Sequence, residues 1–266
     1  MSKLPTNSAP INWANILASA NECAPHFEKV AAAAPYEAKG VLFTEVLFVL
    51  AASGGIAPPT IFESGRAAGV STFLLSACFP NSRIISIERD EHSPDVVLAK
   101  RNLQSCANVD CRFGDSRKLL SELVQPGDIV VIDGPKEYRA LKLAMTLLRK
   151  RQPKAVFIHD CYRGSIEREF LDNNVPGCLF SDQEEFVHRY RNFDSKCWER
   201  TDTMIREGIF IPHLDKGKGA SYGPTFACLP YNPALPYRKL VFQLSVADML
   251  ERLRRSAAKK LGRDRR

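Results

Sequence analysis

The chain has 266 residues, of which 45% are hydrophobic and 25% are charged. A chain of this length and composition buries a sizeable core, which excludes a disordered protein, a collagen-like repeat and a small disulfide-stapled scaffold. The net charge of +7 is confined to one end, because residues 238–266 hold ten Lys or Arg against three acids, while the rest holds 27 of each sign. The body of the protein therefore shows no overall preference for nucleic acid.

The eight cysteines are scattered along the chain, without a Cys-x-x-Cys pair or a zinc-type spacing. This usage predicts reduced thiols and a cytoplasmic protein. The most apolar run, residues 46–52, is seven residues long, far short of the ~20 that a membrane span requires. No apolar segment follows Met1-Ser2-Lys3, so we expect no signal peptide.

Hydrophobic periodicity predicts two helices, at 11–33 and 36–53, followed by strands that alternate with helices. The strands are predicted at 60–64, 83–88, 109–113, 128–133 and 154–160. The helices after them are predicted at 71–79, 94–104, 117–124, 135–149 and 164–173. Such alternation is typical of an open, doubly wound sheet of mostly parallel strands.

Residues 204–213 and 225–229 could then pair as an antiparallel hairpin that closes the sheet. The predicted fold class is α/β, with a Rossmann-like, mostly parallel sheet and this C-terminal antiparallel hairpin. We divide the chain into an N-terminal helical extension that caps the site, the Rossmann-like domain and a basic amphipathic tail. The boundaries are 1–57, 58–237 and 238–266.

Acidic residues stand at or just past the ends of the predicted strands, where open α/β sheets bind their ligands. These acids are Glu63, Glu88, Asp115, Asp133 and Asp160. The first loop, Glu63–Thr72, has Gly65 at its turn and Gly69 at the helix start. It lacks the other glycines of a G-x-G-x-x-G fingerprint, so it predicts close approach of a ligand without phosphate recognition. A plain tight turn is the alternative.

Glu88 follows Gly65 by 23 residues, and a carboxylate at that place can accept hydrogen bonds from both ribose hydroxyls. The charged run at 89–91 leaves a solvated loop acid as the alternative. Asp115 can accept a hydrogen bond from an adenine amino group, or it can cap the helix that follows.

Over roughly residues 60–175 the chain resembles the class I S-adenosylmethionine-dependent methyltransferases. Four motifs carry the resemblance: E-x-G-x-x-x-G-x-S-T at Glu63–Thr72, the acid Glu88, G-D-S at 114–116 and I-D-G-x-x-x-Y at 132–138. The first loop looks most like the branch with sugar and natural-product O-methyltransferases.

The resemblance implies a pocket for S-adenosylmethionine, with Gly65 beside the methionine part, Glu88 on the ribose and Asp115 near the adenine. The cofactor-binding residues expected on this basis are Glu63, Gly65, Gly69, Ser71, Glu88, Asp115 and Asp133.

Asp133 and Asp160 end strands that would be neighbours, so their carboxylates could bind Mg²⁺. Asp133 is followed three residues later by Lys136, which is similar to metal-dependent catechol-type O-methyltransferases, where such a pair supplies a ligand and a general base. Those enzymes usually have Asn after the second aspartate, whereas this chain has Cys161, a poor ligand for Mg²⁺. Metal assistance therefore stays open.

The expected catalytic residues are Lys136, His159 and Asp133. Lys136 can act as a base only if its pKa is lowered, whereas the ordinary pKa of His159 already lies near neutrality. A surface lysine and a histidine satisfied by the core are the alternatives.

The tail places Leu250, Leu253, Ala257 and Leu261 on one helical stripe, with basic residues elsewhere. Such a helix can lie peripherally on an anionic membrane, or the segment can be a solvated helix end or a disordered tail. No aromatic residues interleave with the basic ones, so we expect no nucleic-acid partner.

The sequence thus predicts a cytoplasmic S-adenosylmethionine-dependent methyltransferase that acts on a hydroxyl of a small molecule or sugar. The acceptor and the oligomeric state are left open. One alternative is a cofactor-binding scaffold without catalysis, suggested by Cys161. Another is a nicotinamide-dependent dehydrogenase, disfavoured by Ala67 and Val70.

Overall fold

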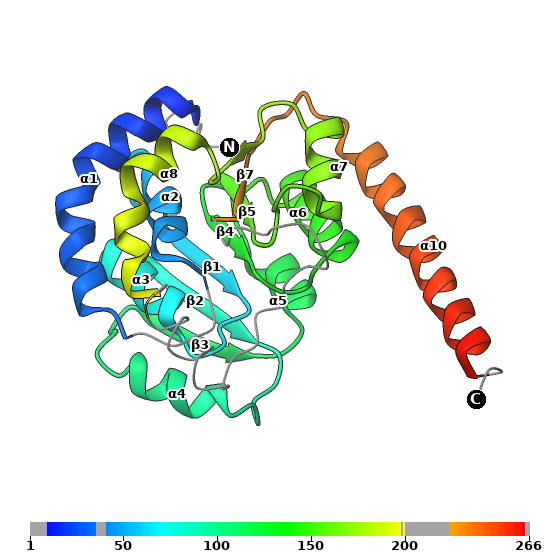
Figure 1. Cartoon of the computed structure of the whole chain (residues 1–266), viewed down its shortest axis with the longest axis horizontal. Coiled ribbons are helices and arrows are strands. Elements are labelled where there is room, and N and C mark those ends of the chain that lie inside the picture. Colours follow the sequence, from blue (N-terminus) through cyan, green and yellow to red (C-terminus); the bar gives the residue numbers. More distant parts are fainter. Residues whose placement is uncertain (1–9, 36–40, 198, 200–223, 264–266) are drawn as a thin grey trace.

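The protein is described by a computed structural model over residues 10–35, 41–197, 199 and 224–263. A seven-stranded sheet with the order β3-β2-β1-β4-β5-β7-β6 forms its centre (Figure 1). The strands are β1 (Thr60–Ser64), β2 (Arg83–Glu88), β3 (Val109–Phe113), β4 (Ile129–Ile132), β5 (Ala155–Ile158), β6 (Leu179–Phe180) and β7 (Ala227–Pro230). The first five strands pair in parallel, and β7 is antiparallel to β5 and β6. The predicted α/β fold class is confirmed.

Helices cover both faces of this sheet (Figure 1). On one side lie α1 (Trp13–Ala33), α2 (Phe43–Ala52), α3 (Val70–Cys78), α8 (Glu184–Tyr190) and the 3₁₀ helix η1 (Arg191–Asp194). On the other side lie α5 (Ser116–Leu123), α6 (Tyr138–Lys150), α7 (Ile166–Asn174) and α10 (Tyr237–Arg263), while α4 (Asp95–Asn102) lies next to α3. The helices of the N-terminal extension therefore share a core with the sheet.

Alternate residues of the parallel strands face the two helical layers. Phe157 belongs to the core under α1, α2 and α8, whereas Val156 and Ile158 belong to the core under α6 and α10. All of β4 and β5 is buried, as expected for parallel strands that are covered on both faces. This explains why the strands read as continuous apolar runs.

One sequence-based expectation needs correction. The helix expected from residue 135 begins at Tyr138, because Glu137 adopts a φ of 59° and donates its N–H to Glu167 at 2.5 Å. The strand expected at 225–229 is present as β7, which pairs antiparallel with β5 on one side and with β6 on the other. The expected partner at 204–213 lies outside the described residues, as do residues 36–40 at the start of the second expected helix.

The strand order reverses between β1 and β4, so the connections from these two strands run in opposite directions. In open α/β sheets, the crevice at such a reversal, beyond the carboxyl ends of the strands, is the usual ligand site. The residues that leave β1 and β4 are Gly65 and Asp133. The fold therefore brings the first glycine loop and the fourth strand-end acid to the same place.

The last helix, α10, packs along α6 through Leu240 and Leu244, which are buried. Farther along, Arg255 donates to both carboxylate oxygens of Glu137 at 2.7 and 2.8 Å. The end of α10 extends beyond the body of the protein (Figure 1). Among the described residues, no helix combines the length and apolar character that a bilayer crossing would require.

Candidate functional site

Gly65 allows the first loop to touch the end of β4. Its φ is +92°, and a Cβ at this position would lie only 3.2 Å from the carbonyl carbon of Asp133 and the nitrogen of Gly134. Its N–H donates to the carbonyl of Ile87 at 2.9 Å. Gly69 has a φ of +80° and caps the start of α3. Gly65 and Gly69 both have positive φ angles, and a side chain at either position would strain the backbone, so the structure explains why glycine stands at both.

Glu63 is a buried anchor beneath this loop, with 1% of its surface exposed. Its carboxylate accepts hydrogen bonds from the hydroxyls of Ser71 and Thr72 on α3 and, at 2.6 Å, of Ser86 on β2. Burial raises the pKa of Glu63, although these hydroxyls oppose the rise. Glu63 and Ser71 therefore use their polar atoms to hold the loop onto the sheet.

Glu88 lies half-buried at the end of β2, as expected from the sequence. Its carboxylate accepts hydrogen bonds from the backbone N–H groups of Ala67, at 3.1 Å, and Arg89, at 2.7 Å. The first loop and the β2 acid are therefore in direct contact. An acid in this position keeps lone pairs available for further donors.

Asp115 is the N-cap of α5, which is the structural alternative that the sequence left open. It accepts a hydrogen bond from the backbone N–H of Arg117 at 3.0 Å and forms an ion pair with the Arg117 guanidinium at 2.6 Å. The hydrogen bonds from Arg117 lower the pKa of Asp115 to about 2. Its carboxylate is thus already engaged beside the end of β3.

A contact between Arg66 and Phe113 was not predicted from the sequence. Arg66 is 3% exposed, donates to the carbonyl of Ser86 at 2.8 Å and lies 5.0 Å above the ring of Phe113. Its Nε has no hydrogen-bond partner within the described part of the chain. Arg66 therefore supports the partly exposed aromatic ring that ends β3.

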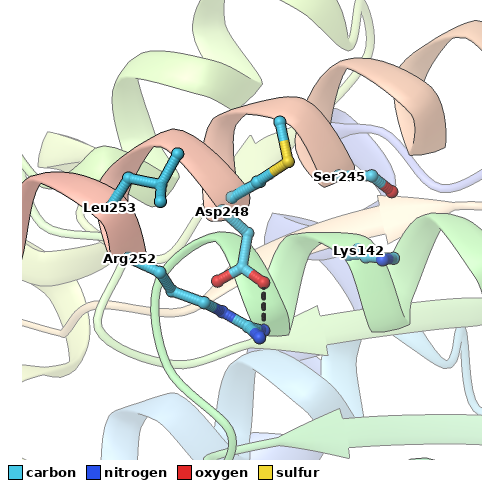
Figure 2. Close-up of a pocket in the computed structure, with 6 residues that line it drawn as sticks. Lys142, Ser245, Asp248, Arg252 and Leu253 are labelled. Atoms are coloured by element: carbon cyan, nitrogen blue, oxygen red, sulfur yellow. Dashed lines mark hydrogen bonds and ion pairs between the residues drawn. The ribbon is translucent and has the colours of Figure 1, made fainter. Parts of the chain in front are cut away.

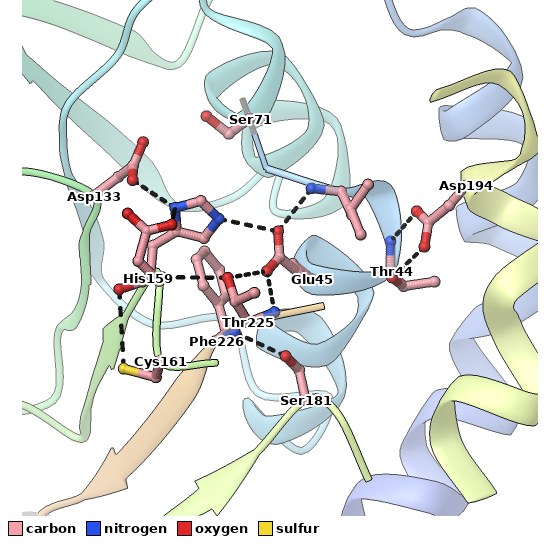
Figure 3. Close-up of polar contacts among 12 residues, drawn as sticks. Thr44, Glu45, Ser71, Asp133, His159, Cys161, Ser181, Asp194, Thr225 and Phe226 are labelled. Carbon is pink, nitrogen blue, oxygen red and sulfur yellow. Dashed lines mark hydrogen bonds and ion pairs between the residues drawn. The ribbon is translucent and has the colours of Figure 1, made fainter. Parts of the chain in front are cut away.

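Asp133, Lys136, His159 and Asp160 form one charged cluster past the ends of β4 and β5. Figure 3 shows the carboxylate of Asp133 directed at the ring of His159. His159 Nδ1 lies 2.6 Å from Asp133 and 3.4 Å from Asp160. Lys136 forms an ion pair with Asp133 and a second one with Asp160 at 2.6 Å. The structure thus brings all four of these expected residues together.

The carboxylates keep both cations of this cluster protonated. Burial alone would lower the pKa of His159, but Glu45 and Asp133 raise it well above its ordinary value. Burial also opposes the charged form of Lys136, yet Asp133 and Asp160 raise its pKa. Burial would raise the pKa of Asp133, but His159 and Lys136 outweigh this effect and lower it. As arranged here, Lys136 is an ammonium ion rather than a free base.

Glu45, on α2, is the site residue that sequence reasoning missed. It is 1% exposed, and one of its oxygens lies 3.4 Å from His159 Nε2 (Figure 3). The same carboxylate accepts hydrogen bonds from the backbone N–H groups of Leu42, at 2.7 Å, and Thr225, at 2.5 Å. A signal was present, since Glu45 is the single charged residue of an otherwise apolar helix.

The fit of a divalent metal is poor in this arrangement. Ligand atoms of Asp133, His159 and Asp160 all lie within 4.8 Å of one another, but the Lys136 ammonium bridges the two carboxylates that Mg²⁺ would need. Cys161 is buried, and its Sγ lies 3.9 Å from the carbonyl oxygen of His159. The predicted pair of metal ligands is therefore neutralised by a side chain of the protein.

Residues 62–161 match the family model described as a methyltransferase domain. This stretch begins within β1 and ends just after β5, so it contains the first loop and the charged cluster. The resemblance to S-adenosylmethionine-dependent methyltransferases expected from the motifs is confirmed for this part of the chain. No curated protein matches the sequence.

The comparison with solved structures finds the following similarities, among others. Cofactor-bound Rv0187 from MTB is 22% identical, with 80% of this chain and 89% of that chain covered and a TM-score of 0.43. An O-methyltransferase from Bacillus cereus in complex with SAH is 16% identical, with 80% and 90% covered and a TM-score of 0.43. SAH-bound Podospora anserina methyltransferase PaMTH1 is 12% identical, with 87% and 99% covered and a TM-score of 0.42.

Proposed function

We propose that this protein is an S-adenosylmethionine-dependent methyltransferase that acts on a hydroxyl group of a small molecule or sugar. The observation that carries the proposal is the meeting of three elements at the reversal of strand order. Gly65 lies against the backbone of Asp133, and Glu88 accepts a hydrogen bond from the same loop. The methyltransferase-domain match covers all three residues.

The first loop fits a nucleoside cofactor that has no phosphate group. Gly65 leaves no room for a Cβ beside the end of β4, so the loop presents its backbone directly to the crevice. Glu88 would accept hydrogen bonds from the ribose hydroxyls. Phe113, held by Arg66, offers a ring face near the adenine end.

The charged cluster of Asp133, Lys136, His159 and Asp160 would bind and activate the hydroxyl acceptor. The bound cofactor would supply the methyl group, and the residues of the chain would orient the acceptor oxygen and remove its proton. We propose His159 as the general base, because an imidazole is ordinarily a much weaker base than a lysine amine, so His159 would lose its proton before Lys136 as the pH rises. A general base contributes roughly 10²–10⁴-fold to such a reaction. We propose that Lys136, rather than Mg²⁺, supplies the positive charge at this site.

Calorimetric titration with S-adenosylhomocysteine tests the cofactor assignment. We expect the wild type to bind and Glu88→Ala to bind at least about 10-fold more weakly, because hydrogen bonds to a charged group are worth about 1.5–3 kcal/mol. Glu91→Ala is the matched control, since Glu91 is exposed on the same loop. It should bind within 2-fold of the wild type.

The proposal fails if the wild type does not bind, or if Glu88→Ala binds as tightly as the wild type. Binding of NADH instead would favour a dehydrogenase. Methyl transfer is then measured with a methyl-labelled cofactor and a panel of phenolic, catecholic and sugar hydroxyls. Cofactor binding without turnover on any of them would favour a non-catalytic scaffold.

We also propose that α10 contacts an anionic membrane surface peripherally. Its apolar side chains divide between two opposite faces: Leu240 and Leu244 are buried against α6, while Phe242, Met249 and Leu253 are exposed. A shallow hollow beside the exposed face is lined by residues of α6 and α10, including Lys142 and Arg252 (Figure 2).

The charge of this segment favours lipid over a second copy of the chain. Residues 238–266 carry a net charge of +7, so two such helices would repel each other, whereas attraction to an anionic bilayer contributes about 1 kcal/mol per basic residue. Sedimentation with phosphatidylserine vesicles should capture the wild type, and Phe242→Ser/Leu253→Ser should stay in solution. Equal capture by phosphatidylcholine vesicles, or dimerisation lost in the double variant, would contradict this contact. A cytoplasmic location fits the eight free cysteines.

A further inference from the structure

The two nitrogens of His159 face different surroundings. Nε2 points to Glu45, which is almost completely buried, whereas Nδ1 points to Asp133 and Asp160, whose side chains are 22% and 40% exposed. Nδ1 therefore lies on the more exposed side of the imidazole, where Asp133 contacts it at 2.6 Å. Nε2 lies on the buried side, where Glu45 is the acid that faces it.

The Glu45 carboxylate is fixed from three directions. Leu42 donates its backbone N–H to one oxygen, and Thr225 donates its backbone N–H and, at 3.0 Å, its hydroxyl to the other. Thr225 in turn accepts a hydrogen bond from the backbone N–H of Asp160 at 3.2 Å. The orientation of Glu45 is thus determined by the chain on both sides of the cluster, from α2 to the approach to β7 (Figure 3).

We infer that Glu45 is a positioning residue: it faces His159 Nε2 from the buried side and, together with Asp133 at Nδ1, fixes the orientation of the ring at the edge of the site that an acceptor would enter. A buried carboxylate that orients the far nitrogen of a histidine fixes its tautomer and stabilises the imidazolium that forms when the base accepts a proton. This inference rests on the proposed methyl transfer. It adds that a residue outside the methyltransferase-domain match, on α2 of the N-terminal helices, belongs to the active site.

The kinetic test compares Glu45→Gln with Thr44→Val. Thr44 is the neighbouring buried residue of α2, and its hydroxyl donates to Asp194 at 2.5 Å, away from His159. Glu45→Gln should lower kcat at least about 10-fold, within the ~10²–10⁴-fold contribution of a general base. The KM for the acceptor and the Kd of S-adenosylhomocysteine should stay within 2-fold. Thr44→Val should keep both kcat and Kd within 2-fold, because it removes the side-chain hydrogen bond of Thr44 to Asp194 but keeps the packing of α2 and removes no contact to His159.

A second measurement does not depend on turnover. In wild-type protein labelled with ¹⁵N-histidine, the Nε2–H of His159 should appear as a ring proton that is protected from exchange with water, with His159→Gln used for its assignment. Thr44→Val should retain this proton, and Glu45→Gln should lose its protection. If Glu45→Gln does not fold, the inference is tested by whether the Nε2–H of His159 is protected from exchange in the wild type and in Thr44→Val.

The inference is overturned if wild-type His159 shows no protected ring proton, if kcat of Glu45→Gln stays within 2-fold of the wild type, or if Thr44→Val loses as much activity. A protected proton in a protein that methylates nothing would leave the positioning role intact and would contradict the proposed function alone. The two failures are therefore distinguishable.

Discussion

Lys136 Nζ lies 2.6 Å from a carboxylate oxygen of Asp160 and also forms an ion pair with Asp133, so one ammonium ion joins the acids at the ends of β4 and β5. A divalent cation would require the same oxygens. We therefore expect methyl transfer by the wild type to be unaffected by EDTA. Loss of activity on chelation, with recovery on addition of Mg²⁺, would contradict this expectation.

Removal of the lysine should create the cation site that the lysine now replaces. Lys136→Met keeps the length of the side chain but leaves Asp133 and Asp160 without their shared positive charge. We expect this variant to bind Mn²⁺ measurably by calorimetry, whereas the wild type should not. The same weak or absent binding in both proteins would show that the two carboxylates are not placed to hold a metal.

Gly65→Ala should cost both stability and cofactor affinity. A φ of +92° strains any L-residue by about 1–2 kcal/mol, and the added Cβ would also press on the backbone of Asp133 and Gly134. Gly177→Ala is the matched control, because Gly177 has a φ of +83° but no atom within 4 Å of the position that an added Cβ would take. Thermal unfolding and S-adenosylhomocysteine titration should show a larger loss for Gly65→Ala in both measurements, with the Kd of Gly177→Ala unchanged. If Gly65→Ala and Gly177→Ala change the Kd of S-adenosylhomocysteine equally, the close contact of Gly65 with the backbone of Asp133 does not determine cofactor affinity.

The rate of methyl transfer should rise with pH above neutrality. The pKa of His159 is raised well above 6.5 by Glu45 and Asp133 against the effect of burial, and a general base must lose its proton before it can act. Glu45→Gln removes one of the two carboxylates, so the rise should move to lower pH while the maximal rate falls. A pH–rate profile from pH 5 to 10 measures where this rise occurs. If the rise in the wild type is centred at or below pH 6.5, His159 with its raised pKa is not the general base.

The contribution of Asp194 to stability should fall as the pH rises from about 4 to 7. Burial raises the pKa of Asp194 from 3.8 to about 6. Over this range the unfolded state has lost a proton that the folded state still holds, so ionisation costs the folded state roughly 2–3 kcal/mol. Asp194→Asn should remove this loss, so the change in its free energy of unfolding by urea between pH 4 and pH 7 should be more favourable than that of the wild type. Asp90→Asn, at an exposed position, should leave that change as it is in the wild type. If the free energy of unfolding changes with pH in the same way for the wild type and Asp194→Asn, the raised pKa of Asp194 is contradicted.

The sheet could be predicted closely because its strands are short apolar runs bounded by glycine, proline or charge. The predicted bounds of β1, β2 and β3 agree with those of the structure. The grouping of Asp133, His159 and Asp160 followed from the same logic, since parallel strands deliver their carboxyl ends to one edge. The start of α6 was misplaced because Pro135 favours a helix start, whereas the positive φ of Glu137 postpones it.

Other features depend on contacts that no local pattern contains. Glu45 and His159 lie far apart in the sequence, and only the packing of α2 against the sheet brings them together. Asp115 stands where either a cofactor contact or a helix cap is chemically reasonable, so the sequence could not decide between them. The structure shows that Asp115 caps α5, and its contact with an adenine stays a prediction. Lys136 could be predicted to lie near Asp133, but its second ion pair with Asp160 required the relative positions of two loops.

The placement of Glu45 bears on how the chain can be divided for study. A fragment that starts at residue 58 would retain the whole segment matched by the methyltransferase domain and every acid at a strand end. Such a fragment would nevertheless expose Phe157 on β5 to solvent and would lack Glu45, the buried carboxylate that faces His159. The smallest unit worth expressing for enzymology therefore includes the N-terminal helices.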